Sequence, residues 1–248
     1  MNWHTRYLQQ AEWTRSLRTY LFEKAEIANA RRVLEVGCGT GAILREIKSP
    51  TSLTSTGVRR KYHGLDLEPA SLSMCRIHAP AASLTRGDAH FLPYPNQSFD
   101  IVYCHFLLLW VRNPLQVVRE MARVGRTVLA LAEPDYSQRV DMPASLKQLG
   151  EWQTQALVRQ GANPSFGARL AETFYQAGIQ LIETGPIQSA EKKRSSEEWK
   201  DEWAVIEADL AESISGENIQ KMKILDENAR KSNERVLHVP TYFAWGKS

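Results

Sequence analysis

The chain has 248 residues, of which 43% are hydrophobic and 24% are charged. These fractions are typical of globular proteins, so they exclude a chain that is disordered throughout, and the length fits a single α/β domain. Lys and Arg number 31 against 28 Asp and Glu. Without a long basic stretch, this near balance argues against nucleic acid or an anionic membrane surface as a partner.

Three cysteines, Cys38, Cys75 and Cys104, are odd in number and lack the spacing of a metal site. Together with an N-terminus that has no apolar signal segment, they predict a reducing, cytoplasmic compartment and no bound metal. The longest uncharged apolar run, residues 101–111, is about half as long as the roughly 20 residues that a membrane helix needs. We therefore expect no membrane span.

Apolar residues recur at helical spacing over 7–22, which predicts one or two helices before the first strand. Strands and helices then alternate as far as residue 132, with a Ser/Thr-rich insertion at about 49–61. The predicted strands are 32–36, 62–66, 84–86, 99–104 and 127–132, and the predicted helices are 42–47, 69–78 and 114–124. This alternation predicts a doubly wound, Rossmann-like, mostly parallel sheet with helices on both faces.

The alternation loosens after Glu133. The remaining predicted elements are a loop at 134–143, helices at 144–160 and 166–177, a strand at 179–183, a charged helical segment at 195–232, and strands at 235–239 and 241–245. No internal repeat and no linker is evident. We therefore expect a single domain over residues 1–248.

Three glycines at alternate positions, Gly37, Gly39 and Gly41, directly follow the first predicted strand. Bare backbone at such a turn can approach a ligand closely, and a turn without a ligand rarely needs three glycines. Residues 37–42 also fit, formally, the Gly-x-Gly-x-x-Gly/Ala pattern of dinucleotide sites. However, Glu35 would repel a pyrophosphate and would suit an ammonium or sulfonium group. The turn therefore favours a cationic ligand over a phosphorylated one.

The run Val-Leu-Glu-Val-Gly-Cys-Gly-Thr-Gly at 33–41 resembles the first motif of the class I S-adenosylmethionine-dependent methyltransferases. The resemblance implies that the turn lies against the amino-acid part of S-adenosylmethionine, and that Glu35 helps to orient the amino group of this cofactor. The turn residues that it assigns to the cofactor are Gly37, Cys38, Gly39 and Gly41.

Two further segments resemble landmarks of that family. Asp66 ends the second predicted strand, where a carboxylate can accept hydrogen bonds from both ribose hydroxyls, and Leu67 would lie against the adenine. In the run Arg-Gly-Asp-Ala-His at 86–90, the resemblance implies that Asp88 accepts from the adenine amino group and that the Ala89 amide donates to the ring. It also places Cys104, at the end of the fourth strand, beside the cofactor.

The resemblance covers residues 31–133 closely and the remainder loosely, and it points to a bacterial, small-molecule branch of the family. It implies methyl transfer to oxygen, nitrogen or carbon of a small-molecule acceptor by in-line displacement, with S-adenosylhomocysteine as product. It further implies an N-terminal helical lid (1–30), a cofactor-binding core (31–133), and acceptor-side insertions with an antiparallel last strand (134–248). The Pro-Pro motif of nucleic-acid amino methylases is absent at 104–107, which favours a small-molecule acceptor over nucleic acid.

Methyl transfer needs positioning and, for a weak nucleophile, a base. The ends of the fourth and fifth strands offer His105, Glu133, Asp135 and Tyr136. His105 is the candidate base, because a histidine pKa near 6.5 suits proton transfer at neutral pH; packing beneath the N-terminal helices is the other interpretation. Asp135 and Tyr136 could orient the acceptor or only shape the loop.

Two alternatives stay open. The first is an NAD(P)-dependent oxidoreductase on a related sheet, and the second is a regulatory protein that binds S-adenosylmethionine without catalysis. The acceptor, the acceptor atom and the oligomeric state are not determined by the sequence, and residues 195–232 could form either the acceptor pocket or an interface.

Overall fold

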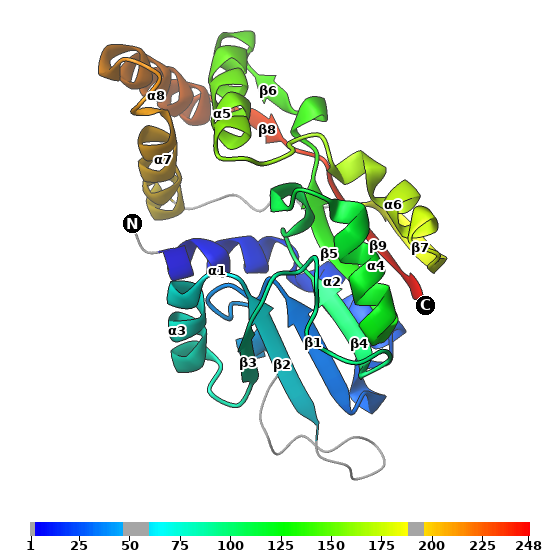
Figure 1. Ribbon diagram of the computed structural model, residues 1–248. Coiled ribbons are helices and arrows are strands. Elements are labelled where there is room, and N and C mark those ends of the chain that lie inside the picture. The colour runs from blue at the N-terminus through cyan, green and yellow to red at the C-terminus, as the bar shows by residue number, and fades with distance from the viewer. Residues whose placement is uncertain (1–2, 47–59, 188–195) are drawn as a thin grey trace.

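The computed structural model describes residues 3–46, 60–187 and 196–248 (Figure 1). Within them, seven strands form one sheet in the order β3-β2-β1-β4-β5-β9-β7. The strands are β1 (Arg32–Val36), β2 (Lys61–Asp66), β3 (Ser83–Arg86), β4 (Phe99–Cys104), β5 (Gly125–Pro134), β7 (Gln180–Pro186) and β9 (Thr241–Lys247). Strands β1 to β5 pair in parallel, whereas β9 is antiparallel to both β5 and β7. The predicted doubly wound, mostly parallel sheet with an antiparallel last strand is confirmed.

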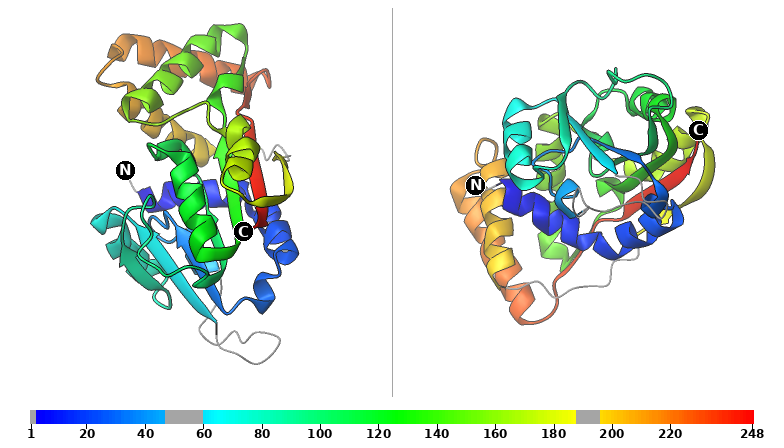
Figure 2. Two further views of the ribbon diagram at one scale, coloured as in Figure 1. Left: turned by 45° about the vertical axis from the view of Figure 1, so that its right-hand side comes forward. Right: turned by 90° about the horizontal axis from the view of Figure 1, so that it is seen from below.

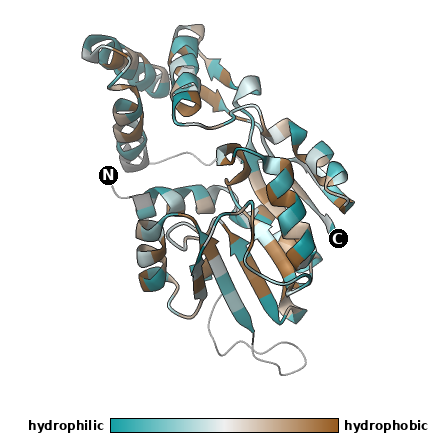
Figure 3. Cartoon of the chain, viewed as in Figure 1, coloured by the Kyte–Doolittle hydropathy of each residue, from teal (hydrophilic) through white to brown (hydrophobic). Residues whose placement is uncertain are grey.

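Helices cover both faces of the sheet. The helices in the described residues are α1 (Trp3–Trp13), α2 (Arg15–Lys24), α3 (Pro69–His78), α4 (Pro114–Val124), α5 (Lys147–Arg159), α6 (Leu170–Gln176), α7 (Ser196–Leu210) and α8 (Gly216–Lys231), and α1, α2, α3, α4 and α6 lie against the sheet. Strand side chains alternate between the faces. Val102 and Val128 pack with residues of α4 and α6, whereas Ile101 and Leu129 pack with residues of α2 and α3. Hydrophobic residues accordingly concentrate on the central strands (Figure 3).

Local capping explains two helix starts that agree with the prediction. Helix α4 begins at Pro114, directly after Asn113, whose side chain accepts a hydrogen bond from Gln116 N (3.1 Å). Helix α3 begins at Pro69, after Glu68, whose carboxylate accepts from Ala70 N. Proline suits the first helical position because its missing N–H would have no partner there.

The structure differs from the prediction in two places. The helix expected at 42–47 is a 3₁₀ turn, η2 (Leu44–Glu46), in the described part, and most of the 49–61 insertion lies outside the described residues. The predicted loop at 134–143 contains η4 (Tyr136–Gln138) and a short strand, β6 (Val140–Met142). The strand expected at 235–239 is present as β8 (Val236–His238), which pairs with β6 in a separate two-stranded sheet.

Helices α5, α7 and α8, with strands β6 and β8, form a separate layer, here called the helical cap. The cap lies beyond the carboxyl ends of the parallel strands (Figures 1 and 2). It has an apolar cluster of its own, which contains Leu149, Trp203, Ile206, Leu210 and Ile219.

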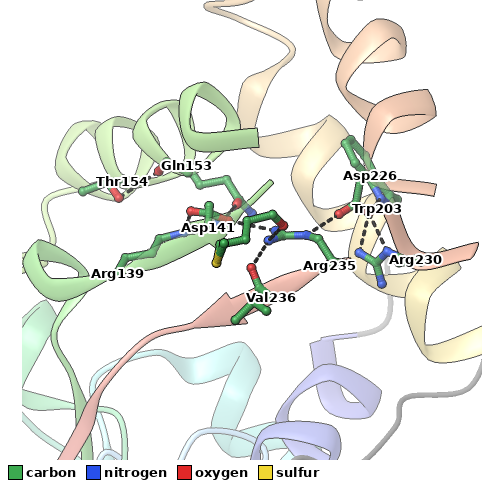
Figure 4. A network of polar contacts seen from close by, with 11 residues as sticks. Arg139, Asp141, Gln153, Thr154, Trp203, Asp226, Arg230, Arg235 and Val236 are labelled. Carbon is green, nitrogen blue, oxygen red and sulfur yellow. Dashed lines mark hydrogen bonds and ion pairs between the residues drawn. The ribbon is translucent and has the colours of Figure 1, made fainter. Parts of the chain in front are cut away.

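Two buried carboxylates tie the strands of the cap to its helices (Figure 4). Asp141, on β6, accepts from Arg139 Nε (2.6 Å) and pairs with Arg235 (2.8 Å). Asp226, on α8, accepts from Arg235 Nε (2.7 Å) and from Trp203 Nε1 (2.7 Å). Arg235 therefore joins the two carboxylates, and the cap is held by a polar network as well as by its apolar cluster.

Gly150, on α5, faces this network and gives a test of it. A Cβ atom there would lie 2.1 Å from Asp141 Oδ2 and 2.8 Å from Arg139 Nε. Alanine in a helix usually gains about 1 kcal/mol over glycine, but here it must displace a buried, paired carboxylate. We expect Gly150→Ala to lower the free energy of unfolding by about 2–4 kcal/mol in urea denaturation. Gly216→Ala is the matched control, because a Cβ at Gly216 meets open space; equal stability of the two variants would contradict the prediction.

Within the described ranges, no helix combines the length and the hydrophobicity needed to cross a bilayer.

Candidate active site

The glycine turn connects β1 to η2 at the carboxyl edge of the sheet. Gly37 has φ +72° and Gly41 has φ +83°, in the left-handed region that favours glycine. The backbone N–H groups of Gly37 and Cys38 both donate to Leu65 O, at 2.8 and 3.0 Å. The turn is therefore fixed across the end of β2.

Asp66, the last residue of β2, binds the middle of this turn. Its Oδ2 accepts from Gly39 N (2.7 Å) and its Oδ1 accepts from Glu68 N (2.9 Å). The next side chain, Leu67, is 62% exposed although it is apolar. The structure thus brings together three features that the sequence analysis assigned to one ligand.

Asp88 and Ala89 lie at the same edge. In the β2–β3 register Asp66 is opposite Arg86, the last residue of β3, so Asp88 lies two residues beyond the end of the neighbouring strand. Asp88 Oδ1 accepts from His90 N (2.9 Å) and from His90 Nδ1 (2.7 Å), and these bonds lower the pKa of Asp88. Its Oδ2 has no hydrogen-bond partner among the described residues, so one oxygen of this exposed carboxylate is available to a ligand.

Glu35 is buried beneath the turn. It accepts from the Tyr103 hydroxyl (3.1 Å), and burial raises its pKa well above the ordinary value. Arg18, also buried, lies near enough to act on this carboxyl in the opposite direction. A cationic group that approached the turn would favour the ionised form of Glu35.

The cysteines predicted to contact the cofactor turn their side chains inward. Cys38 is 4% exposed, and its thiol is near enough to that of Cys75 on α3 to raise the pKa of Cys38. Cys104 is fully buried in the apolar cluster between the sheet and α4. Any contact of Cys38 or Cys104 with a ligand would therefore come from the backbone.

His105 is not suited to be the general base that the sequence suggested. Its Nε2 lies 2.9 Å from the Thr14 hydroxyl, where the N-terminal helices cover the end of β4. Burial and the nearby Arg18 guanidinium lower the pKa of His105 to about 3. A ring with this pKa is a weak proton acceptor, so the packing interpretation is the better one.

Asp135 and Tyr136 follow β5 but have different surroundings. Asp135 Oδ1 accepts from Ser137 N (3.0 Å) and Oδ2 accepts from Ala168 N (3.0 Å), so this buried carboxylate shapes the loop. The Tyr136 hydroxyl makes no hydrogen bond to any described residue, and burial raises the pKa of this phenol. The charges that act on its pKa come from α1, the segment after η4, and α7: Arg6, Arg139, Glu202 and Asp209.

Helix α1, in the segment that the resemblance implied to be a lid, contacts the glycine turn and also the helical cap, and the second contact was not predicted from the sequence. His4 Nδ1 lies 2.8 Å from the Thr40 hydroxyl, and the Tyr7 ring lies over Gly39. On its other side, Arg6 forms an ion pair with Glu202 of α7, and the two helices lie side by side in Figures 1 and 2. An aromatic face marked this helix in the sequence, but no spacing could show a pair that joins residues 6 and 202.

In the portions of the chain that the structure describes, no group of three or more His, Cys, Asp or Glu side chains is placed to hold a metal ion.

Residues 34–127 match the family model described as a methyltransferase domain. Malonyl-[acyl-carrier protein] O-methyltransferase of Halorhodospira halophila is 34% identical over 129 residues, covering 48% of this chain and 40% of that protein. Phthiotriol/phenolphthiotriol dimycocerosates methyltransferase of Mycobacterium leprae is 33% identical over 135 residues, covering 50% and 42%. The chain thus spans about two fifths of the length of these curated relatives.

Among solved structures, phosphoethanolamine N-methyltransferase 2 of Haemonchus contortus, in complex with phosphomonomethylethanolamine and S-adenosylhomocysteine, has a TM-score of 0.57. It is 13% identical, and the match covers 97% of this chain and 56% of that one. At this identity the likeness concerns the fold.

Proposed function

We propose that this chain, which belongs to the class I S-adenosylmethionine-dependent methyltransferases, transfers a methyl group from S-adenosylmethionine to a small-molecule acceptor. The observation that carries the proposal is the hydrogen bond from Gly39 N to Asp66, which joins the glycine turn to the carboxylate at the end of β2. The acceptor atom would be oxygen, nitrogen or carbon.

The residues at this edge fit the cofactor chemically. Asp66 still has acceptor capacity for ribose hydroxyls, since each carboxylate oxygen has two acceptor sites. Leu67 offers exposed apolar surface to an adenine ring, and Asp88 offers a free oxygen to its amino group. Glu35 would act on the amino group of the methionine part, directly or through water. When bound, the cofactor supplies a methyl group activated by the sulfonium.

The chain itself supplies positioning and exclusion of water in this proposal. Residues 1–30 form a lid, because α1 contacts both the turn and α7, and a lid that excludes water strengthens polar interactions beneath it. Residues 31–133 hold the cofactor, and 134–248 supply the acceptor side of the same domain. Tyr136 is the candidate for orienting the acceptor, because its hydroxyl is free among charged neighbours from α1 and α7. The unpaired cysteines keep a reducing cytoplasm as the expected location.

Thermal unfolding in the presence of S-adenosylhomocysteine, NADH or NADPH, followed by an acceptor screen, tests the proposal. At 100 times its dissociation constant a ligand adds about 2.7 kcal/mol to stability, which corresponds to about 5–10 °C in the unfolding midpoint of a chain of this size. We expect this shift with S-adenosylhomocysteine and none with NADH or NADPH. Release of S-adenosylhomocysteine with any amine, hydroxyl or carboxylate acceptor would distinguish an enzyme from a binding protein. A shift with a nicotinamide alone would overturn the proposal.

A further inference from the structure

The loop after β4, residues 105–110, is held by one carboxylate. Glu133, on β5, is fully buried. Its Oε1 accepts from Leu107 N (3.0 Å) and Leu108 N (2.9 Å), and its Oε2 accepts from Leu109 N (3.2 Å). Three successive backbone N–H groups that converge on an anion form an anion-binding nest, and hydrogen bonds to an ionised acceptor are stronger than neutral ones.

This loop needs such support because its backbone is unusual. Phe106 has φ +51°, a left-handed conformation that is uncommon for a residue with a large side chain. Its N–H donates to Ala132 O (2.9 Å), and at the other end Leu109 O accepts from Asn163 N (2.7 Å). Glu133 binds the N–H groups of the three residues that follow Phe106, the last of which is Leu109.

The conformation of the loop determines what touches the glycine turn. The side chain of Leu107 packs directly on Gly37: a Cβ at Gly37 would lie 2.7 Å from Leu107 Cδ1. At the start of the loop, His105 contacts Thr14 beneath the lid. The same six residues therefore meet the turn on one side and the N-terminal helices on the other.

We infer that Glu133 is a positioning residue for methyl transfer, whose carboxylate fixes the loop after β4 so that Leu107 supports the glycine turn. This inference rests on the proposed function, because the turn is the element that would hold S-adenosylmethionine. Glu133 touches neither cofactor nor acceptor in this role; it acts through the loop backbone.

The protonation state of Glu133 gives a distinctive readout. Burial raises the pKa of Glu133 to about 7, against the effect of the three backbone N–H groups. Among the titratable groups, Cys104 at the end of β4 is close enough for Glu133 to act on its pKa, Tyr242 is opposite Glu133 on β9, and Asp135 follows it by two residues in the sequence. Burial raises the pKa of Cys104 and lowers that of His105, so both are neutral near pH 7.

Affinity and stability should respond to pH in opposite directions. Above pH 7 the ionised carboxylate accepts all three N–H groups, whereas below pH 7 a protonated oxygen accepts less well, so cofactor affinity should rise with pH. Folding stability should change with pH in the reverse direction, because the pKa of Glu133 in the folded chain lies above its ordinary value of 4.5. The contribution of Glu133 to the free energy of unfolding is therefore complete below pH 4.5 and is lost as the pH rises through 7. A role confined to stability would therefore not produce higher affinity at higher pH.

Calorimetry with S-adenosylhomocysteine at pH 6, 7 and 8 tests the inference on the full chain. We expect wild-type affinity to rise about threefold to tenfold from pH 6 to pH 8. Titration of a single group can change an equilibrium constant by at most about tenfold for each pH unit, so the expected rise lies within that limit. Glu133→Gln should bind about fivefold more weakly at pH 8, the equivalent of one lost hydrogen bond, and its affinity should not change with pH. Folded Glu133→Gln with wild-type affinity and the same pH profile would overturn the inference.

Two further variants keep the test decisive. Asp100→Asn is the matched control. Asp100 also accepts two successive N–H groups, from Arg31 (2.7 Å) and Arg32 (2.9 Å), but it lies at the amino-terminal edge of the sheet. The Asp100→Asn variant should therefore bind S-adenosylhomocysteine as tightly as the wild type does. If Glu133→Gln does not fold, Leu107→Ala removes the contact with the turn instead and should weaken binding about fivefold; wild-type affinity would overturn the inference. Failure of the wild-type chain to bind at any pH would overturn the proposed function itself, and the positioning role with it.

Discussion

Asp66→Ala is expected to weaken S-adenosylhomocysteine binding by a factor of about 100 or more. The Asp66 carboxylate holds Gly39 N at 2.7 Å and, in the proposed function, accepts from the ribose hydroxyls. Hydrogen bonds to a charged group contribute about 1.5–3 kcal/mol each, so losing two of them corresponds to roughly two to four powers of ten in affinity. Calorimetry of the purified variant measures the change.

Glu68→Ala is the control for this prediction. Glu68 is an exposed carboxylate two residues away, and its side chain caps α3 by accepting from Ala70 N (3.3 Å). Loss of this cap should cost about 1 kcal/mol of stability and leave the affinity within about twofold. If Asp66→Ala and Glu68→Ala bound S-adenosylhomocysteine equally well, the assignment of Asp66 to the ribose would be wrong.

The cofactor side of this protein could be predicted from sequence because its features are local. A β-branched strand followed at once by Gly37, Gly39 and Gly41 specifies both the fold of the turn and its open backbone. Asp66 ends the next strand, and parallel strands bring their carboxyl ends to one edge. Helices α3 and α4 were equally predictable, since proline and a capping side chain mark each start within two residues.

The acceptor side could not be predicted in the same way because its contacts are long-range. Strand β6 has three residues and pairs with β8, nearly a hundred residues away in the chain. The Arg6–Glu202 ion pair joins α1 to α7 and leaves no periodic signal. The short strand β6 therefore resembled a loop in the sequence, and nothing in the sequence showed which strand would pair with the run at 235–239.

Residue type also misled the choice of catalytic candidates after β4 and β5. Histidine and aspartate at strand ends suggest proton transfer, yet His105 is half-buried beneath the lid and contacts Thr14, and Asp135 accepts backbone N–H groups. Glu133 has the same kind of partners as Asp135. At this edge irregular backbone must be satisfied away from water, and buried carboxylates provide the acceptors. Among these candidate side chains, only Tyr136 has a polar group, its hydroxyl, that makes no hydrogen bond to a described residue.

Asp226→Asn is expected to lower the free energy of unfolding by about 3–5 kcal/mol. The Asp226 side chain is 1% exposed and accepts from Trp203 Nε1, Arg230 Nε and Arg235 Nε, each at 2.7 Å. Asparagine keeps one acceptor oxygen but turns donor N–H atoms toward arginine donors, and it leaves the buried Arg235 with only one of its two carboxylate partners. Urea denaturation followed by tryptophan fluorescence measures the loss, since Trp203 lies in the network (Figure 4).

Glu207→Gln controls for the general effect of removing an ion pair between the same two helices. Glu207 on α7 pairs with Lys223 on α8 at 2.7 Å, but the two side chains are 41% and 29% exposed, so its loss should cost at most about 1 kcal/mol. A cost below about 1 kcal/mol for Asp226→Asn would contradict the role given to the network. Because the residues assigned to the cofactor lie between 35 and 104, Asp226→Asn should retain S-adenosylhomocysteine affinity while the cap is weakened. Any change in turnover would then arise on the acceptor side, which is where the proposed function places residues 134–248.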